Sequence, residues 1–311
     1  MIEEIGNVIL DLTQYEGADQ YTDGLIEDQM LSMAMLPDEP ADEDICSSWP
    51  IFYHFSKMRE NIVSWLPVTD SDDILEIGSG CGAITGAFSR MACHVDCVDL
   101  SRKRSQINAY RHKACKNIKI NVGNFQAITF DKKYDWISLI GVFEYAKGFG
   151  LGPDPYMAML EKVRGLLKPG GRLVIAIENK FGMKYWAGCR EDHTGRLFDN
   201  IQGYPESSSV TTFSKNELES MLITSGYAEN TFYYPMPDYK LPRMIFSENH
   251  LPKPGVLRDQ IVNYDQERLY LFNEGLAWDE IIKAGQFPFF ANSFLTVSSC
   301  VPGNSSAGGQ S

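Results

Sequence analysis

The sequence predicts an α/β protein built on a seven-stranded, mostly parallel sheet with an antiparallel last strand. Short apolar runs, which are typical of buried parallel strands, alternate along the chain with segments of helical periodicity. A turn rich in glycine joins the first of these runs, residues 74–77, to a helix. A late strand-like run at residues 294–298 follows the repeated strand–helix order and predicts the antiparallel strand.

The composition is that of a globular protein with a large core: 311 residues, of which 44% are apolar and 22% charged. Seven cysteines in irregular spacing, without a C-x-x-C pair, favour neither a disulfide framework nor a structural zinc site. No apolar run reaches membrane-spanning length, and the first residues lack the basic start of a secretory signal. We therefore expect a cytoplasmic protein without a membrane span.

The net charge of −13 is concentrated at the start of the chain. Residues 1–56 contain no Lys or Arg and residues 1–45 hold 13 acids, whereas the remaining 28 acids balance the 28 basic residues. Nothing here forms the basic face that nucleic-acid binding needs. The acidic leader, residues 1–45, is expected to be a solvated face, with a docking surface for a partner as the alternative.

Two segments precede the first strand of the core. Residues 1–48 are expected to form an appendage packed on the core, with a short strand at 8–12 and a helix at 24–35. Residues 49–66 are interpreted as an aromatic lead followed by a helix that Ser56 caps. The buried side of this helix would carry Met58, Ile62, Val63 and Trp65.

The first strand and its turn are the stretch most suited to a ligand. Gly78, Gly80 and Gly82 allow tight backbone angles and close approach, and the following helix points unpaired N–H groups at the crevice. Glu76 adds a carboxylate at the end of the strand. The string also fits the dinucleotide pattern G-x-G-x-x-G/A, with Ala83 in the last place, so taken alone it leaves the ligand open.

The second strand, residues 94–99, ends in Asp99, which lies 21 residues after Gly78. At this distance an acid at the end of the second strand meets a ribose diol, because its two oxygens can accept both hydroxyl hydrogen bonds. The alternative is that Asp99 caps the helix that begins near Ser101. We favour the ribose role.

The string acid-Ile-Gly-x-Gly-x-Gly resembles motif I of class I S-adenosylmethionine (SAM) methyltransferases. Leu-Leu-Lys-Pro-Gly-Gly-Arg-Leu, residues 166–173, is similar to a second signature of that family. The resemblance implies a Rossmann-like fold and SAM as the cofactor, with the glycine turn around its methionine part. The cofactor-binding residues would then be Glu76, Gly78, Ser79, Gly80, Gly82, Asp99, Leu100, Asn124, Phe125, Gly141 and Tyr53.

The same resemblance assigns roles to individual positions. After the third strand, residues 117–122, Asn124 would hydrogen-bond the adenine amine and Phe125 would lie against its ring. Residues 141–146 resemble the family's V-L-E-H segment, with Tyr145 in place of the His, and they lack the Asn/Asp-Pro-Pro-Tyr pattern of methyltransferases that act on bases or glutamine. The element before the first strand would form a lid over the cofactor, with the wall residues Tyr53, His54 and Arg59.

The rest of the chain follows the strand–helix order, interrupted by two insertions. Strands are expected at 134–140, 172–178 and 226–234, and helices at 101–115, 155–167, 214–225 and 276–283. The insertions, residues 179–212 and 235–291, should rise from the carboxyl edge of the sheet as lids or substrate walls. The predicted division is an appendage at 1–48, a methyltransferase domain at 49–300 and a disordered tail at 301–311.

Residues 178–204 and 233–240, together with Tyr-His-Phe-Ser at 53–56, resemble a bacterial subgroup of these methyltransferases. Members of that subgroup are associated with, or fused to, glycosyltransferases of surface polysaccharide synthesis. The resemblance implies a glycan or other small-molecule acceptor, and a glycosyltransferase as a partner.

A sugar hydroxyl is a weak nucleophile, so a base near the methyl group would speed its transfer. His193 is the predicted base and Asp192 a carboxylate that orients it; the alternative is that residues 191–193 cap a loop or helix. Glu144 and Tyr145 are the second choice for the acceptor site. No metal is expected, because adjacent positions rarely converge on one ion. The lid aromatics that would stack on a sugar, or simply pack, are Tyr185, Trp186, Tyr204 and Tyr239.

Three functions remain open from the sequence. SAM-dependent methyl transfer to a hydroxyl of a sugar, glycan or related small molecule leads. An NAD-dependent oxidoreductase is supported by the glycine turn and Asp99, and disfavoured by Glu76 and the signature at residues 166–173. The third is a non-catalytic SAM-binding partner of a glycosyltransferase that docks through the acidic leader.

Overall fold

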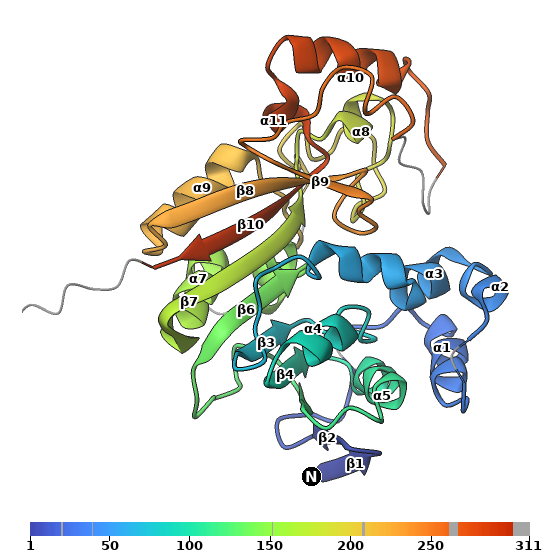
Figure 1. Cartoon of the computed structure of the whole chain (residues 1–311), viewed down its shortest axis with the longest axis vertical. Coiled ribbons are helices and arrows are strands. Elements are labelled where there is room, and N and C mark those ends of the chain that lie inside the picture. The colour runs from blue at the N-terminus through green and yellow to red at the C-terminus, as the bar shows by residue number, and fades with distance from the viewer. Residues whose placement is uncertain (20, 39, 151, 207–208, 261–266, 301–311) are drawn as a thin grey trace, which may run out of the picture.

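A single ten-stranded sheet runs through the molecule in the computed structural model (Figure 1). The structure describes residues 1–311 except 20, 39, 151, 207–208, 261–266 and 301–311, so the predicted disordered tail lies outside the described residues. The strand order is β1-β2-β5-β4-β3-β6-β7-β10-β8-β9.

Seven of these strands form the predicted core sheet. They are β3 (Asp73–Ile77), β4 (His94–Asp99), β5 (Ile118–Val122), β6 (Tyr134–Ile140), β7 (Leu167–Glu178), β8 (Glu229–Met236) and β10 (Ser293–Ser299). The last strand, β10, is antiparallel to both β7 and β8, while β3 pairs in parallel with β4 and β6. The predicted α/β class and its antiparallel last strand are confirmed. Because the chain order reverses at β3, a crevice opens at the carboxyl ends of β3, β4 and β6.

Three further strands extend the sheet at its two edges. At one edge, β1 (Ile2–Ile5) and β2 (Val8–Asp11) form a hairpin, and β2 runs parallel beside β5. At the other edge, β9 (Met244–Ser247) pairs antiparallel with β8. The predicted count of seven strands is therefore too low, because short strands from the appendage and the second insertion join the same sheet.

Helices cover both faces of the sheet, and consecutive strand residues alternate between two cores. In β3, Ile74 packs on the face covered by α4 (Thr85–Met91) and α5 (Arg102–Arg111). Its neighbour Leu75 packs on the opposite face with residues of α7 (Pro155–Leu166) and α9 (Lys215–Thr224). The long apolar runs of the sequence follow from this two-sided burial.

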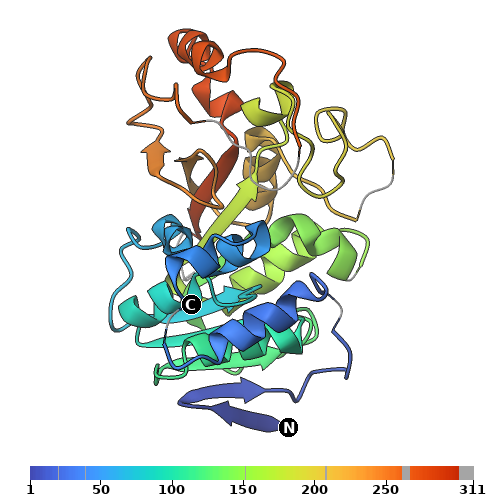
Figure 2. The ribbon, with the colours of Figure 1, turned by 90° about the vertical axis from the view of Figure 1, so that its right-hand side faces the viewer.

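The two insertions lie together at one end of the molecule, opposite the N-terminal hairpin (Figure 2). They contain α8 (Met183–Trp186), α10 (Glu274–Lys283) and α11 (Phe287–Phe290), and α10 begins two residues before its predicted start. None of the helices in the described part of the chain is long and apolar enough to cross a bilayer.

The segment before β3 differs from its prediction. The aromatic stretch is itself a helix, α3 (Trp49–Phe55), with Pro50 in its first turn, where a missing N–H costs nothing. A short 3₁₀ helix, η1 (Lys57–Ile62), follows, and Ser56 caps it by accepting a hydrogen bond from the Met58 backbone. Trp65, predicted to be buried, is 39% exposed and lies edge-on to Tyr233.

The acidic leader is neither simply a solvated face nor a free docking surface. Many of its acids bind basic side chains on or near α5. One of them binds the N-terminal end of that helix. Asp19 accepts hydrogen bonds from the Ser101 hydroxyl and the Arg102 backbone N–H, both at 2.7 Å. The ion pairs are Glu3–Arg102, Asp11–Lys119, Asp23–Arg104, Glu27–Arg104 and Asp28–Lys103. These contacts hold the leader, and with it α1 (Ile26–Ala34), against the core.

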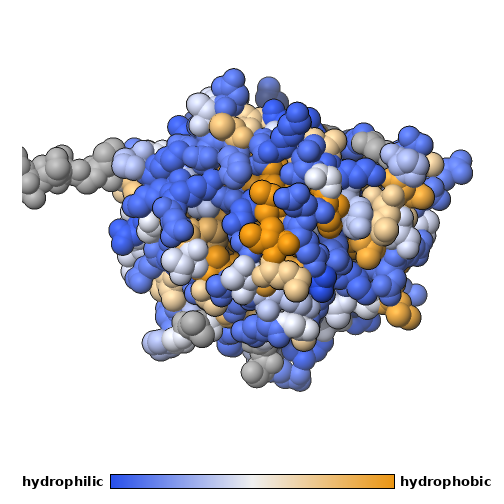
Figure 3. Space-filling view, turned by 90° about the horizontal axis from the view of Figure 1, so that it is seen from below, coloured by the Kyte–Doolittle hydropathy of each residue, from blue (hydrophilic) through white to orange (hydrophobic). Residues whose placement is uncertain are grey.

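The face seen from below in Figure 3 is largely hydrophilic, with apolar side chains gathered near its centre. Exposed apolar residues of the N-terminal hairpin are Met1, Ile2 and Ile9.

Candidate active site

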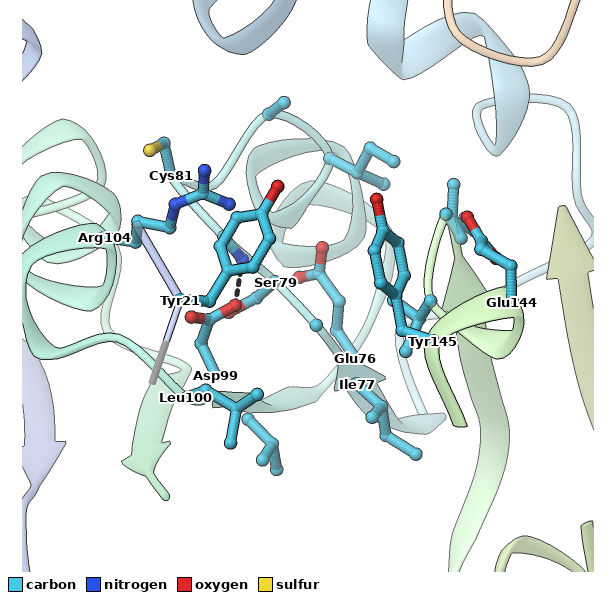
Figure 4. A pocket seen from close by; sticks show the side chains of 18 of the residues that line it. Tyr21, Glu76, Ile77, Ser79, Cys81, Asp99, Leu100, Arg104, Glu144 and Tyr145 are labelled. Atoms are coloured by element: carbon cyan, nitrogen blue, oxygen red, sulfur yellow. Dashed lines mark hydrogen bonds between the residues drawn. The ribbon is translucent and has the colours of Figure 1, made fainter. Parts of the chain in front are cut away.

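A cavity of about 570 Å³ lies at the carboxyl ends of the central strands, where the chain order reverses. Its floor comes from the segments after β3, β4, β5 and β6, and both insertions contribute to its wall. Figure 4 shows Asp99 on one side of the crevice, Glu76 in the middle, and Tyr145 and Glu144 on the other side. The predicted residues that line the cavity are Tyr53, Glu76, Gly78, Ser79, Gly80, Asp99, Leu100, Asn124, Phe125, Gly141, Glu144, Asp192 and His193.

The three glycines of the turn have different structural roles. All have positive φ angles, 72° at Gly78, 52° at Gly80 and 77° at Gly82. A Cβ at Gly78 would lie 2.3 Å from a methyl of Val142, and one at Gly82 would lie 2.3 Å from the Asn108 side chain. A Cβ at Gly80 would meet nothing within 4 Å. Gly80 therefore opens onto the cavity, whereas Gly82 serves packing against α5 and, contrary to the prediction, does not line the cavity.

Asp99 lies at the end of β4, and hydrogen bonds from backbone N–H groups fix both of its carboxylate oxygens. One oxygen accepts the Gly80 N–H at 2.8 Å and the other accepts the Ser101 N–H at 2.9 Å. The cap of α5 is Ser101, whose hydroxyl accepts the Arg104 N–H, so the alternative cap role for Asp99 is wrong. Burial raises the Asp99 pKa, and each oxygen keeps a lone pair for hydroxyl donors of a ligand.

Glu76 and Ser79 place further polar atoms beside the turn. Glu76 accepts a hydrogen bond from the Thr85 hydroxyl at 2.6 Å, and burial raises its pKa to about 7. The Ser79 hydroxyl is buried without a hydrogen-bond partner in the described part of the chain. A buried polar atom without a partner costs free energy unless a ligand satisfies it, so this end of the cavity is suited to a polar ligand.

The residues predicted to meet the adenine already have partners in their own loop, in α6 (Ala146–Phe149) and in α7. The Asn124 side chain donates to the Phe149 carbonyl at 3.1 Å and accepts the Gln126 N–H at 2.9 Å. Its amide oxygen keeps one lone pair, so the adenine contact stays a prediction. Phe125 lies under the Lys162 ammonium, 4.6 Å from the ring centre, and is 5% exposed.

The leader and α3 contribute to the wall of the cavity. Tyr21 lies beneath the Arg104 guanidinium at 4.3 Å and Tyr53 beneath that of Arg59 at 4.2 Å. His54 lies 3.4 Å from Asp23, and burial lowers its pKa to about 4. The predicted wall residues are therefore in place, and Tyr21 is a wall residue that the sequence patterns missed.

The other end of the cavity is lined by Asp192, His193 and Lys240, which belong to a buried network of charges from β7 and both insertions. The Lys240 ammonium contacts Glu178 at 2.5 Å and Asp192 at 2.7 Å. The Lys184 ammonium contacts Asp192 at 2.8 Å and Asp238 at 3.6 Å. Sequence reasoning missed Glu178, Lys184, Asp238 and Lys240; an available signal was the position of Glu178 at the carboxyl end of β7.

His193 is oriented by Glu191, not by Asp192. Its Nδ1 lies 2.9 Å from Glu191 Oε1, and its Nε2 lies 4.0 Å from Glu144 Oε1. Although burial lowers the His193 pKa, the hydrogen bond to Glu191 and the nearby carboxylates raise it to about 9. Without a ligand the ring is therefore protonated at neutral pH, which argues against the predicted role as a base.

Glu144 lies beside His193 and is fully buried. Burial and the Glu178 charge raise its pKa. Neither of its carboxylate oxygens has a hydrogen-bond partner within the described ranges. The Tyr145 ring packs edge-on against His193, with ring centres 5.3 Å apart.

Of the four lid aromatics, Tyr239 lines the cavity and the other three do not. Tyr239 approaches Gly141 so closely that a Cβ there would lie 2.9 Å from its hydroxyl. Tyr185 donates to Asp192, and Tyr204 lies 3.2 Å from Glu191, so both support the charge network. Trp186 is 38% exposed.

Residues 75–173, which contain the glycine turn and four strands of the core sheet, match a family model described as a methyltransferase domain. This part of the chain is similar to a methyltransferase domain. The match supports the predicted enzyme class and SAM as the cofactor, and it argues against the oxidoreductase alternative.

The curated relatives are similar to this chain over a limited region. Demethylmenaquinone methyltransferases of two Tropheryma whipplei strains, Twist and TW08/27, are 28% identical over 124 residues, which is 40% of this chain and 49% of theirs. The match thus spans about half the length of these relatives.

Alignments with solved structures cover more of this chain, at a lower sequence identity. The complex of the Haloferax volcanii methyltransferase activator Trm112 with a methyltransferase aligns at TM-score 0.48 and 18% identity, over 80% of this chain and 90% of that one. Haemonchus contortus phosphoethanolamine N-methyltransferase 1 aligns at TM-score 0.48 and 14% identity, over 92% of this chain and 52% of that one. These likenesses are too weak to identify what this chain binds or acts on.

Proposed function

We propose that this protein binds SAM in the crevice and transfers its methyl group to a hydroxyl of a sugar, glycan or related small molecule. The observation that carries the proposal is one continuous cavity with Asp99 and the glycine turn at one end and the buried charge network at the other. The chain therefore has a cofactor end and an acceptor end in one enclosure.

The residues at the cofactor end fit SAM. Asp99 has lone pairs for the two ribose hydroxyls, and the open space at Gly80 allows close approach of a ligand to the backbone. Glu76 and the unpartnered Ser79 hydroxyl offer polar atoms to the charged methionine part. When bound, SAM supplies an activated methyl group, which is transferred to an oxygen without any covalent bond to the protein.

The acceptor end supports a hydroxylated acceptor. Charged groups of both signs, including Glu144, Asp192 and Lys240, lie beside the Tyr145 and Tyr239 rings. Hydroxyl groups can donate to the carboxylates and accept from the ammonium, while the tyrosines exclude water and pack on apolar faces. An apolar acceptor such as a menaquinone precursor, suggested by the name of the curated relatives, would leave the Glu144 oxygens, which lack a hydrogen-bond partner among the described residues, unsatisfied.

The resemblance to glycosyltransferase-associated methyltransferases supports a glycan acceptor and a glycosyltransferase partner as part of the proposal. The acidic leader offers less docking surface than the sequence suggests, because many of its acids bind α5. Docking through the leader is therefore not included.

Calorimetry with SAM, S-adenosylhomocysteine and NAD tests the cofactor, and transfer of labelled methyl from SAM to a set of sugars, nucleotide sugars and quinols tests the acceptor. We expect binding of both adenosyl compounds, no binding of NAD, and label on a hydroxylated sugar compound. Absence of adenosyl binding would overturn the proposal, and label on a quinol alone would overturn its acceptor class. Binding without transfer to any compound would favour the non-catalytic alternative.

A further inference from the structure

Two buried carboxylates at the acceptor end have oxygens that nothing in the described structure satisfies. Glu144 and Glu178 are both fully buried. Both oxygens of Glu144 and Oε2 of Glu178 lack a hydrogen-bond partner among the described residues. A buried carboxylate without a partner loses its hydration and gains nothing in return, so these three oxygens mark a place where a ligand belongs.

The ring of His193 lies next to them in a fixed orientation. Its Nδ1 contacts Glu191 at 2.9 Å, and its Nε2 lies 4.0 Å from Glu144. A carboxylate on one ring nitrogen of a histidine is the usual arrangement when the other nitrogen binds a metal. A ring nitrogen of His193 and one oxygen each of Glu144 and Glu178 lie within 4.8 Å of one another.

Other buried or nearly buried charged side chains surround these three residues. The carboxylates are Glu191, Asp192 and Asp238, and the ammonium groups are those of Lys184 and Lys240.

We propose that Glu144, Glu178 and His193 bind a divalent metal ion at the acceptor end of the cavity. The three ligands come from the segment after β6, the end of β7 and the first insertion, so the objection to adjacent ligands does not apply to them. A mixed carboxylate and imidazole set suits Mn²⁺, Fe²⁺ or Zn²⁺. Bonds of about 2.0–2.2 Å to one ion require these ligand atoms, which now lie within 4.8 Å of one another, to move closer together.

The role of the ion rests on the proposed function. Three protein ligands leave coordination positions for the acceptor, and an acceptor hydroxyl bound there would have a lowered pKa. Its proton leaves to solvent, the oxygen forms a bond to the methyl carbon as the carbon–sulfur bond of SAM breaks, and S-adenosylhomocysteine is released. The metal would thus perform the activation that the sequence assigned to His193.

Titration of the full chain with Mn²⁺, followed by loss of the free-ion electron paramagnetic resonance signal, tests the site without SAM. We expect about one Mn²⁺ per chain with a Kd in the micromolar range, and at least a tenfold weaker Kd for Glu144→Gln. The matched control is Glu280→Gln, whose side chain is 74% exposed on α10, and it should bind as the wild type does.

Thermal unfolding separates loss of the site from loss of the fold. Glu144→Gln should be at least as stable as the wild type without metal, because it replaces a buried carboxyl group that has no hydrogen-bond partner among the described residues. Mn²⁺ should raise the Tm of the wild type and Glu280→Gln, and not that of Glu144→Gln. The proposal is overturned if the wild type binds neither Mn²⁺ nor Zn²⁺, or if Glu144→Gln binds them equally well.

The two proposals can fail separately. Metal binding without SAM binding would leave the metal site standing and remove the proposed function. If the chain takes up no metal and still binds SAM and transfers methyl groups in the presence of EDTA, the metal site is overturned and the proposed function stands. Binding of an organic amine in place of metal would also overturn the metal site.

Discussion

The Arg59 guanidinium donates a 2.9 Å hydrogen bond to the backbone carbonyl of Lys240, which lies 181 residues further along the chain. Arg59 is 4% exposed and also lies over Tyr53. This contact joins the cover of the cofactor end to the loop that carries the acceptor-end ammonium, so the two ends of the cavity share one support.

Replacing Arg59 should therefore weaken cofactor binding. Arg59→Ala removes the contact with Lys240 and uncovers Tyr53, and we expect a roughly tenfold higher Kd for SAM by calorimetry. Arg90→Ala is the control, because Arg90 is largely exposed and pairs with Glu60 at the surface. An unchanged Kd in Arg59→Ala would show that the cover does not contribute to binding.

Asp99→Asn should lower SAM affinity by tenfold or more. The amide offers one acceptor oxygen where the carboxylate offers two, and its NH₂ group faces the Gly80 or Ser101 N–H. Calorimetry measures the effect, with the exposed Asp70→Asn as the control. Equal affinities in the two variants would contradict the ribose role.

The glycines should separate binding from stability. Gly80→Ala meets no atom within 4 Å, so it should cost about 1 kcal/mol through its positive φ while its methyl obstructs SAM. Gly82→Ala would contact the Asn108 side chain and should mainly lower the free energy of unfolding. Urea unfolding and calorimetry on both variants check this; a similar loss of SAM binding in both, at equal stability, would contradict it.

Glu76 should make stability depend on pH. Its pKa is raised from 4.5 to about 7 in the folded protein, so the folded state binds the proton more tightly and loses stability as pH rises between these values. Glu76→Gln removes this loss, so its stability relative to the wild type should rise by about 2 kcal/mol between about pH 5.5 and about pH 8. A difference that does not vary with pH in urea unfolding would show that the carboxyl group keeps its ordinary pKa.

Asp19→Ala should release the leader from α5. It removes the acceptor for the Ser101 hydroxyl and the Arg102 N–H at the start of that helix. We expect a loss of about 1 kcal/mol in the free energy of unfolding, smaller at high salt. Glu43→Ala, an exposed acid of the same leader, should have little effect. Equal losses in both variants would assign the effect to net charge alone.

The core of the fold could be predicted from the sequence because its signals are local. Apolar runs at residues 74–77 and 94–99, the glycine turn and the late strand each depend on neighbouring residues. The prediction was wrong where a segment had two competing signals. Residues 49–55 combine aromatic content with Pro50, and that proline begins a helix instead of preceding one. The short strand β9 has no fully buried residue, so its pattern was too weak to detect.

The acceptor end could not be predicted because its members lie far apart in the sequence. Lys240 meets Glu178 across 62 residues, and neither belongs to a recognisable local pattern. His193 was predicted as a site residue because carboxylates flank it in the sequence. Its hydrogen-bond partner is Glu191, and its pKa depends on groups from three segments. The acids of the leader likewise have partners in α5 that charge counting does not reveal.

The N-terminal hairpin has a consequence for handling the protein. Because β2 pairs with β5, deletion of residues 1–12 would expose a row of backbone amides and carbonyls along β5, which would become an edge strand. An unpaired edge strand can pair with a strand of another molecule. The shortened protein should therefore aggregate even if its crevice stays intact. The N-terminal hairpin thus protects this edge of the sheet against self-association.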